Sequence, residues 1–94
     1  MDEKQIEEVG IKLRMVSDLL TDTEKLVAQN KTYIRVLLQD IADDRCPLTA
    51  DELDGEIRGL REDREAVIRA LQQVEELLGA VQAILVPTHD SASN

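Results

Sequence analysis

Aromatic residues are almost absent from this sequence. Its 94 residues include one tyrosine, Tyr33, and neither tryptophan nor phenylalanine. β-Sheets usually collect aromatic and β-branched side chains, whereas the contacts between helices can be filled by Leu, Ile, Val, Met and Ala. A chain of this length also has room for only one small core. The composition therefore favours a single all-α domain.

Positive charge is also scarce. Eleven Lys and Arg stand against 20 Asp and Glu, which gives a net charge of -9. Nucleic acids and anionic membrane surfaces are bound through clustered Lys and Arg, so we expect no direct binding to either. The longest apolar stretch, AVQAILV, is far shorter than the roughly 20 residues of a membrane helix, and the acidic start MDEKQIEE is unlike a secretory signal. We expect a cytoplasmic protein.

Groups that bind metals or perform catalysis are few. Cys46 and His89 are the only residues of their types, which is too few for a zinc site, and a lone cysteine cannot form an internal disulfide. His89, Asp90 and Ser91 are the residue types of a nucleophilic triad, but adjacent residues in a polar tail cannot hold its geometry. There is no glycine-rich phosphate-binding loop. We expect no enzymatic activity, no metal and no cofactor.

Hydrophobic residues at a seven-residue spacing are the main positive feature. In the first half, one set recurs at Ile6, Leu13, Leu20, Val27, Ile34 and Ile41, and a second follows three residues later at Val9, Val16, Thr23, Asn30 and Leu37. The second half repeats the pattern, with Leu53, Leu60, Val67, Val74 and Val81 in one set and Ile57, Arg64, Leu71, Leu78 and Leu85 in the other. This spacing predicts two long amphipathic helices, over about residues 3–43 and 50–86.

The segment between the helices predicts a turn. Pro47 discourages continuation of the first helix, and Thr49 with Glu52 has the spacing of a capping box at the start of the second. A turn at residues 44–49 is so short that the helices must fold back as an antiparallel hairpin over residues 1–86. Pro87 ends the second helix, and we expect the polar tail 87–94 to be disordered.

Folding the chain about residue 47 predicts which residues face each other. Positions whose numbers sum to about 94 lie at one level, so that Leu37 faces Ile57 and Val27 faces Val67. The same rule puts Asn30 opposite Arg64, the clearest polar residues of the two hydrophobic seams. We expect Asn30 to accept hydrogen bonds from the Arg64 guanidinium in a buried polar layer that fixes the register.

More hydrophobic residues are present than one two-helix seam can bury. A second stripe flanks the predicted seam, and we expect it to form a dimer interface that includes Met15, Leu19, Leu26, Tyr33, Leu77 and Ile84. Two hairpins would then form a four-helix bundle, most simply as a homodimer. A heteromer in which another protein supplies the other two helices is the alternative.

The predicted turn lies in a strongly acidic segment. Residues 40–56 contain seven acidic residues and one arginine, a net charge of -6, and the acidic residues are Asp40, Asp43, Asp44, Asp51, Glu52, Asp54 and Glu56. Those at the start of the second helix suit the helix dipole, whereas Asp43 and Asp44 at the end of the first helix do not. We call this set the acidic tip and expect it to bind a protein partner, possibly one with a basic surface.

Three kinds of function remain open. The first is a small dimeric adaptor, regulator or inhibitor that binds a protein through the acidic tip or the flank of the bundle. The second is a nucleic-acid mimic, such as a phage-type inhibitor that occupies a basic nucleic-acid-binding groove, although Lys and Arg are interleaved with acids along the first helix. The third is an assembly or secretion chaperone.

Overall fold

Two long helices make up the fold. The computed structural model describes residues 1–45 and 48–85, with helix α1 at Glu3–Ala42 and helix α2 at Ala50–Leu85. The predicted all-α class is confirmed, and each helix agrees with its predicted bounds to within one residue. No strand occurs within residues 1–45 and 48–85. The predictions that rest on Cys46, Pro47 and the tail 87–94 lie outside the described residues.

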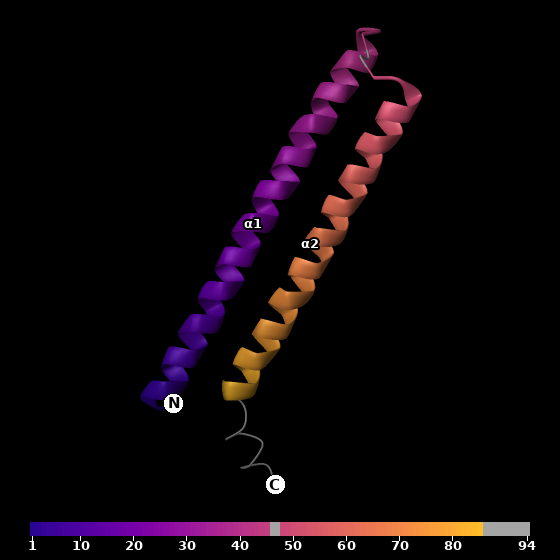
Figure 1. Cartoon of the computed structure of the whole chain (residues 1–94). Coiled ribbons are helices and arrows are strands. Elements are labelled where there is room, and N and C mark those ends of the chain that lie inside the picture. The colour runs from indigo at the N-terminus through magenta and orange to yellow at the C-terminus, as the bar shows by residue number, and fades with distance from the viewer. Residues whose placement is uncertain (46–47, 86–94) are drawn as a thin grey trace. The chain divides into compact units, whose positions relative to one another are not determined.

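The chain divides into two compact units. Unit 1 joins Met1–Thr21 to Arg69–Asn94, and unit 2 is Asp22–Ile68. In each unit a stretch of α1 runs beside a stretch of α2 in the opposite direction (Figure 1). The predicted helical hairpin is therefore confirmed. Its association into a four-helix bundle concerns a second molecule and stays a prediction.

Unit 1 has an aliphatic core. Val16 on α1 and Val74 and Val81 on α2 are buried. Around them lie half-buried side chains that are mostly small or aliphatic: Val9, Leu19, Ala70, Leu77, Ala80 and Ile84. Burying one such side chain contributes roughly 1.5 to 3 kcal/mol, so these residues account for much of the packing in this unit.

Unit 2 has a more polar interior. Leu37 is its one buried hydrophobic residue among those the structure describes. Its half-buried positions include both hydrophobic and polar residues: Thr23, Leu26, Asn30, Tyr33, Asp40, Leu48, Leu53, Gly59, Leu60, Asp63, Ala66 and Val67. Unit 2 therefore gains less from apolar burial than unit 1.

Of the two predicted seam rows on each helix, one turns inward as predicted and the other is exposed. The rows from Val9 to Leu37 and from Leu53 to Val81 do supply the buried and many of the half-buried positions. The rows assigned beside them are exposed instead: Ile6, Leu13, Leu20, Val27, Ile34 and Ile41 on α1, and Ile57, Arg64, Leu71, Leu78 and Leu85 on α2. The two helices are rotated relative to the predicted packing.

Most of the residues predicted to form the dimer interface lie on the inner side of the hairpin instead. Leu19, Leu26, Tyr33, Leu77 and Ile84 are half-buried within the single chain, and Met15 is exposed. A seven-residue repeat places one row on each side of the central row, and the spacing does not distinguish between them. The half-buried flank of α2 carries the small residues Ala66, Ala70 and Ala80. The distance between two packed helices depends on the side chains at the contact, so small residues give a physical reason for this flank to turn inward.

Both helices begin with a capping box. At α2 the Thr49 hydroxyl accepts a hydrogen bond from the Glu52 amide at 3.2 Å, and the Glu52 carboxylate accepts one from the Thr49 amide at 3.3 Å. This confirms the predicted cap. At α1 the Asp2 carboxylate accepts from the Gln5 amide at 2.8 Å, and the Gln5 side-chain oxygen accepts from the Asp2 amide at 3.0 Å. This second box was not predicted.

The hydropathy of both helices differs from that of membrane-spanning helices. Within the described residues, neither α1 nor α2 contains a stretch that is both apolar and long enough to cross a bilayer.

Candidate interaction surfaces

The acidic tip is built around the C-terminal end of α1. The Arg45 amide donates to the Asp40 carbonyl at 2.8 Å, and the Asp44 amide donates to the Ile41 carbonyl at 3.1 Å. These are the two hydrogen bonds of a Schellman motif, in which the residue after the cap is left-handed. Asp44 occupies that position with a φ of 56°. Asp tolerates this conformation better than most residues, which gives Asp44 a structural role that its charge alone did not suggest.

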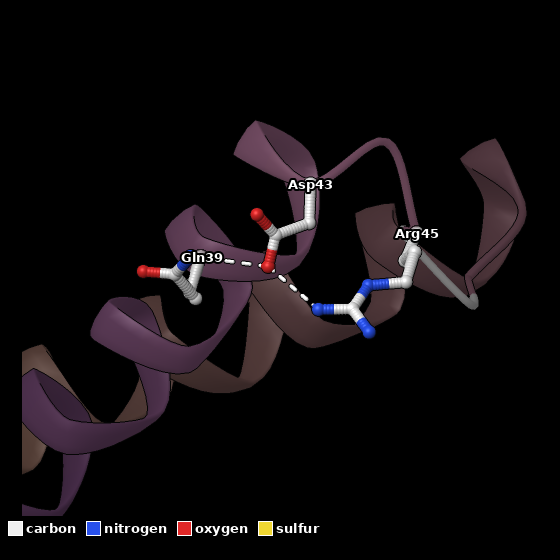
Figure 2. A network of polar contacts seen from close by, with 3 residues as sticks. All are labelled: Gln39, Asp43 and Arg45. Atoms are coloured by element: carbon white, nitrogen blue, oxygen red, sulfur yellow. Dashed lines mark hydrogen bonds and ion pairs between the residues drawn. The ribbon is translucent and has the colours of Figure 1, made fainter.

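Asp43 joins the end of α1 to the turn. Its carboxylate accepts hydrogen bonds from the Gln39 side-chain amide at 3.1 Å and from the Arg45 guanidinium at 2.6 Å (Figure 2). These two bonds, that from Gln39 first, lower the pKa of the Asp43 carboxyl below its usual value of 3.8. An anion is unfavourable at a helix C-terminus, and Arg45 compensates for it. Asp43 is therefore a structural member of the tip.

Two further acidic side chains of the tip also have local partners. Glu52 belongs to the capping box of α2, and Asp54 pairs with Arg58 one turn later at 3.0 Å. Both carboxylates lie near the start of α2, where the helix dipole favours negative charge. An exposed pair such as Asp54–Arg58 contributes about 0.3 to 0.5 kcal/mol, so its stabilising effect is small.

The remaining acidic residues of the tip have charge available for a partner. Asp40, Asp44, Asp51 and Glu56 make no side-chain hydrogen bond or ion pair with another described residue. All are exposed except Asp40, which is half-buried. In the described part of the chain, no three His, Cys, Asp or Glu side chains are grouped so that they could hold a metal ion. The arrangement suits diffuse attraction of cationic groups more than chelation of one ion.

A groove lies between the helices of unit 2. It has a volume of about 400 Å³ and is open to solvent, and its lining consists of Val27, Asn30, Lys31, Ile34, Arg64, Val67 and Ile68. Val27 and Ile34 are 49% and 42% exposed, and Ile68 is 40% exposed. The groove is thus an apolar surface with two cationic side chains, on a protein whose net charge is negative.

Asn30 and Arg64 meet at this groove without forming the predicted buried layer. Both line it, which agrees with the predicted register, but Asn30 is half-buried and Arg64 is exposed. No hydrogen bond joins them, and no polar side chain is buried anywhere in the described residues. The rotation of the helices is the cause, because it turns the row of Arg64 out of the interior. The guanidinium therefore remains in water, where its hydration is not lost.

Each unit exposes an apolar row from both helices. In unit 1 these are Ile6, Leu13 and Leu20 with Leu71, Leu78 and Leu85, and in unit 2 they are Val27, Ile34 and Ile41 with Ile57 and Ile68. We call them the exposed apolar rows. Single exposed hydrophobic residues are ordinary on protein surfaces, whereas rows repeated at helical spacing are typical of helix-binding surfaces. Sequence reasoning found all of these residues except Ile68, but it placed them inside the hairpin.

A smaller hollow lies on the other side of Asn30. It measures about 210 Å³ and is lined by Asn30, Tyr33, Glu56, Gly59, Leu60, Glu62 and Asp63. A side chain built onto Gly59 would meet nothing within 4 Å, so the glycine is not there to admit another part of the described chain.

Comparison with known proteins finds no relative from which a function could be transferred: no protein-family model, no curated protein and no solved structure matches the chain.

Proposed function

We propose that this protein is a non-enzymatic helical interaction module, a small adaptor, regulator or inhibitor that works as a homodimer. The exposed apolar rows carry this proposal. The rows contain eleven large aliphatic residues that are 39% to 56% exposed, and burying the exposed part of each would add a share of the roughly 1.5 to 3 kcal/mol that full burial contributes. Helices that pack onto these rows would bury them, as in a four-helix bundle. Self-association is therefore the first activity that we assign to the module.

The acidic tip is the second surface, and we assign to it the binding of a protein partner with a basic surface. Support comes from Asp44, Asp51 and Glu56, which are exposed and make no side-chain bond within the described residues. The nucleic-acid mimic receives less support, because ion pairs such as Lys12–Glu8 and Arg58–Asp54 interleave cations with the acidic groups. No observation favours the chaperone over the module.

Sedimentation equilibrium of the full chain tests the apolar rows. We expect a mass twice that of the 10.5 kDa chain, unchanged when the salt concentration is raised to about 1 M, because apolar burial is not screened by ions. The double variant Val27→Ser with Ile34→Ser should be monomeric and still helical by circular dichroism. The matched control, Ile11→Ser, replaces a hydrophobic residue that is as exposed as these but lies outside the rows, and it should stay dimeric. A monomeric wild-type chain would contradict the proposal.

The tip is tested with a lysine-rich peptide as probe. The triple variant Asp44→Asn, Asp51→Asn and Glu56→Gln removes charge without removing a side-chain bond of the turn, so that helicity should stay at the wild-type level. Binding should weaken by on the order of tenfold, and the wild-type affinity should fall steeply with salt. Equal binding by the two proteins would exclude the tip.

A further inference from the structure

We propose that the groove of unit 2 is occupied by a second copy of this chain in antiparallel orientation, with Glu24 of each copy paired to Lys31 of the other. This inference rests on the self-association proposed above and adds the occupant, its direction and its register. It follows from the charges beside the groove and from the spacing of the apolar row on α1.

Two charged side chains on the groove side of α1 have no partner among the described residues. Lys31 lines the groove, and Glu24 lies seven residues earlier, two helical turns away on the same side of α1. Neither forms an ion pair or side-chain hydrogen bond with another described residue, although Lys12, Arg45 and Arg58 do. Both side chains are exposed. One anion and one cation, neither paired with another described residue, therefore lie on the same side of α1.

A parallel second copy would place equal levels together. The cations of the groove, Lys31 and Arg64, would then meet the same two cations of the other molecule. Four positive charges would gather at one level of an apolar interface, and like charges placed opposite each other are destabilising. A parallel pair would also place Glu24 of one molecule opposite Glu24 of the other. Charge therefore disfavours this orientation.

An antiparallel copy solves both problems. When the two-fold axis passes near Val27 and Ala28, midway between Glu24 and Lys31, each carboxylate comes within about one turn of the other copy's ammonium group. The interface is isologous, so that one kind of pair forms twice. The apolar row tolerates the reversal, because Val27, Ile34 and Ile41 repeat at seven residues in either direction. The groove then receives Val27 of the other molecule, because that residue lies next to the axis.

Charge reversal tests the pairing in the full chain. Glu24→Lys and Lys31→Glu each convert two attractive pairs into two repulsive ones, and each should raise the dimer dissociation constant by on the order of tenfold at low salt. The double variant should return to within about threefold of wild type. A mixture of the two single variants should form heterodimers in preference to either homodimer. Lys25→Glu is the matched control: it makes the same charge change on a residue that lines a different hollow, and it should have no such effect.

Cysteine cross-linking tests the orientation independently, with the native Cys46 replaced by serine. Val27→Cys lies near the proposed axis and should oxidise to a disulfide-linked dimer, whereas Ile34→Cys should not, because an antiparallel copy carries that position about 20 Å away. Equal cross-linking at both positions, or a dimer that charge reversal leaves unchanged, would overturn the antiparallel pairing while self-association stands. A chain that is monomeric at every concentration would overturn self-association itself.

Discussion

Unit 1 and unit 2 are built from the same two helices, yet they differ in what they bury. Unit 1 contains three of the four buried hydrophobic residues of the described chain, Val16, Val74 and Val81. Unit 2 contains the fourth, Leu37, together with the polar positions Asn30 and Asp63, the groove and the acidic tip. Most of the buried hydrophobic residues therefore lie in one unit and the groove and acidic tip in the other, and we expect the stability of the hairpin to depend mainly on unit 1.

The largest effect should come from truncating the core of unit 1. Val74→Ala removes a buried side chain and should lower the free energy of unfolding by about 2 kcal/mol, since it loses apolar burial and leaves a cavity. Val67→Ala makes the same change at a half-buried position of unit 2 and should cost about half as much. Urea unfolding at one fixed protein concentration measures both. Equal losses of stability would contradict the expectation that the hairpin depends more on unit 1 than on unit 2.

The next effect concerns the capping box of α2, which belongs to unit 2. Thr49→Ala removes the hydroxyl that accepts from the Glu52 amide and should destabilise the helix start by about 1 kcal/mol. Amide hydrogen exchange should show faster exchange in the first turns of α2 and little change in unit 1. Thr49→Ser keeps the hydroxyl and serves as control. If exchange rises equally in both units, the hairpin opens as a single cooperative structure and the division has no energetic meaning.

Replacing Asn30 should have a smaller effect, and it should raise the free energy of unfolding. This side chain is half-buried, lines the groove and makes no hydrogen bond with another described residue, so that its partial desolvation is not offset within the chain. Asn30→Leu should therefore raise the free energy of unfolding by up to about 1 kcal/mol and make unit 2 more like unit 1. Thermal unfolding measures it. A lower melting temperature would show that Asn30 is satisfied by water or by a second molecule.

The smallest effect is the pH dependence of Asp43. Its folded pKa lies below the usual 3.8, so the carboxylate stabilises the fold above about pH 4 and loses this contribution as the pH falls through the folded pKa. The difference in stability between wild type and Asp43→Asn should be present near neutral pH and should vanish once the pH has fallen below the folded pKa. Asp44→Asn is the control, because the Asp44 carboxylate has no side-chain partner in the described residues. A difference that is constant with pH would exclude the Gln39 and Arg45 bonds as its source.

Much of the local structure could be predicted because it depends on neighbours in sequence. The ends of both helices and the Thr49–Glu52 cap follow from residues within one turn of each other. The Schellman motif at Asp44 was missed, since helices usually end this way at glycine and here an acidic residue takes the left-handed position. Its sequence signal was weak: an Asp pair placed where the helix dipole disfavours negative charge.

The acidic tip could be located by composition but not sorted by role. Counting charges identified residues 40–56, yet it could not show that Asp43 and Asp54 have partners within the chain, whereas the partner of Glu52 follows from the capping-box spacing. Whether Asp43 and Asp54 are paired depends on the conformation that each side chain adopts. The structure thereby leaves a smaller set of carboxylates for binding and makes the tip easier to test.

Spacing along the chain is enough to predict two amphipathic helices, an antiparallel hairpin and the level at which Asn30 and Arg64 lie. The flank of each helix that turns inward depends instead on how the two helices pack. Two rows beside a central row satisfy a seven-residue repeat equally well, and the flank of α2 that turns inward is the one that carries Ala70 and Ala80. This arrangement leaves Val27 and Ile34 about half exposed, on the surface to which we assign self-association.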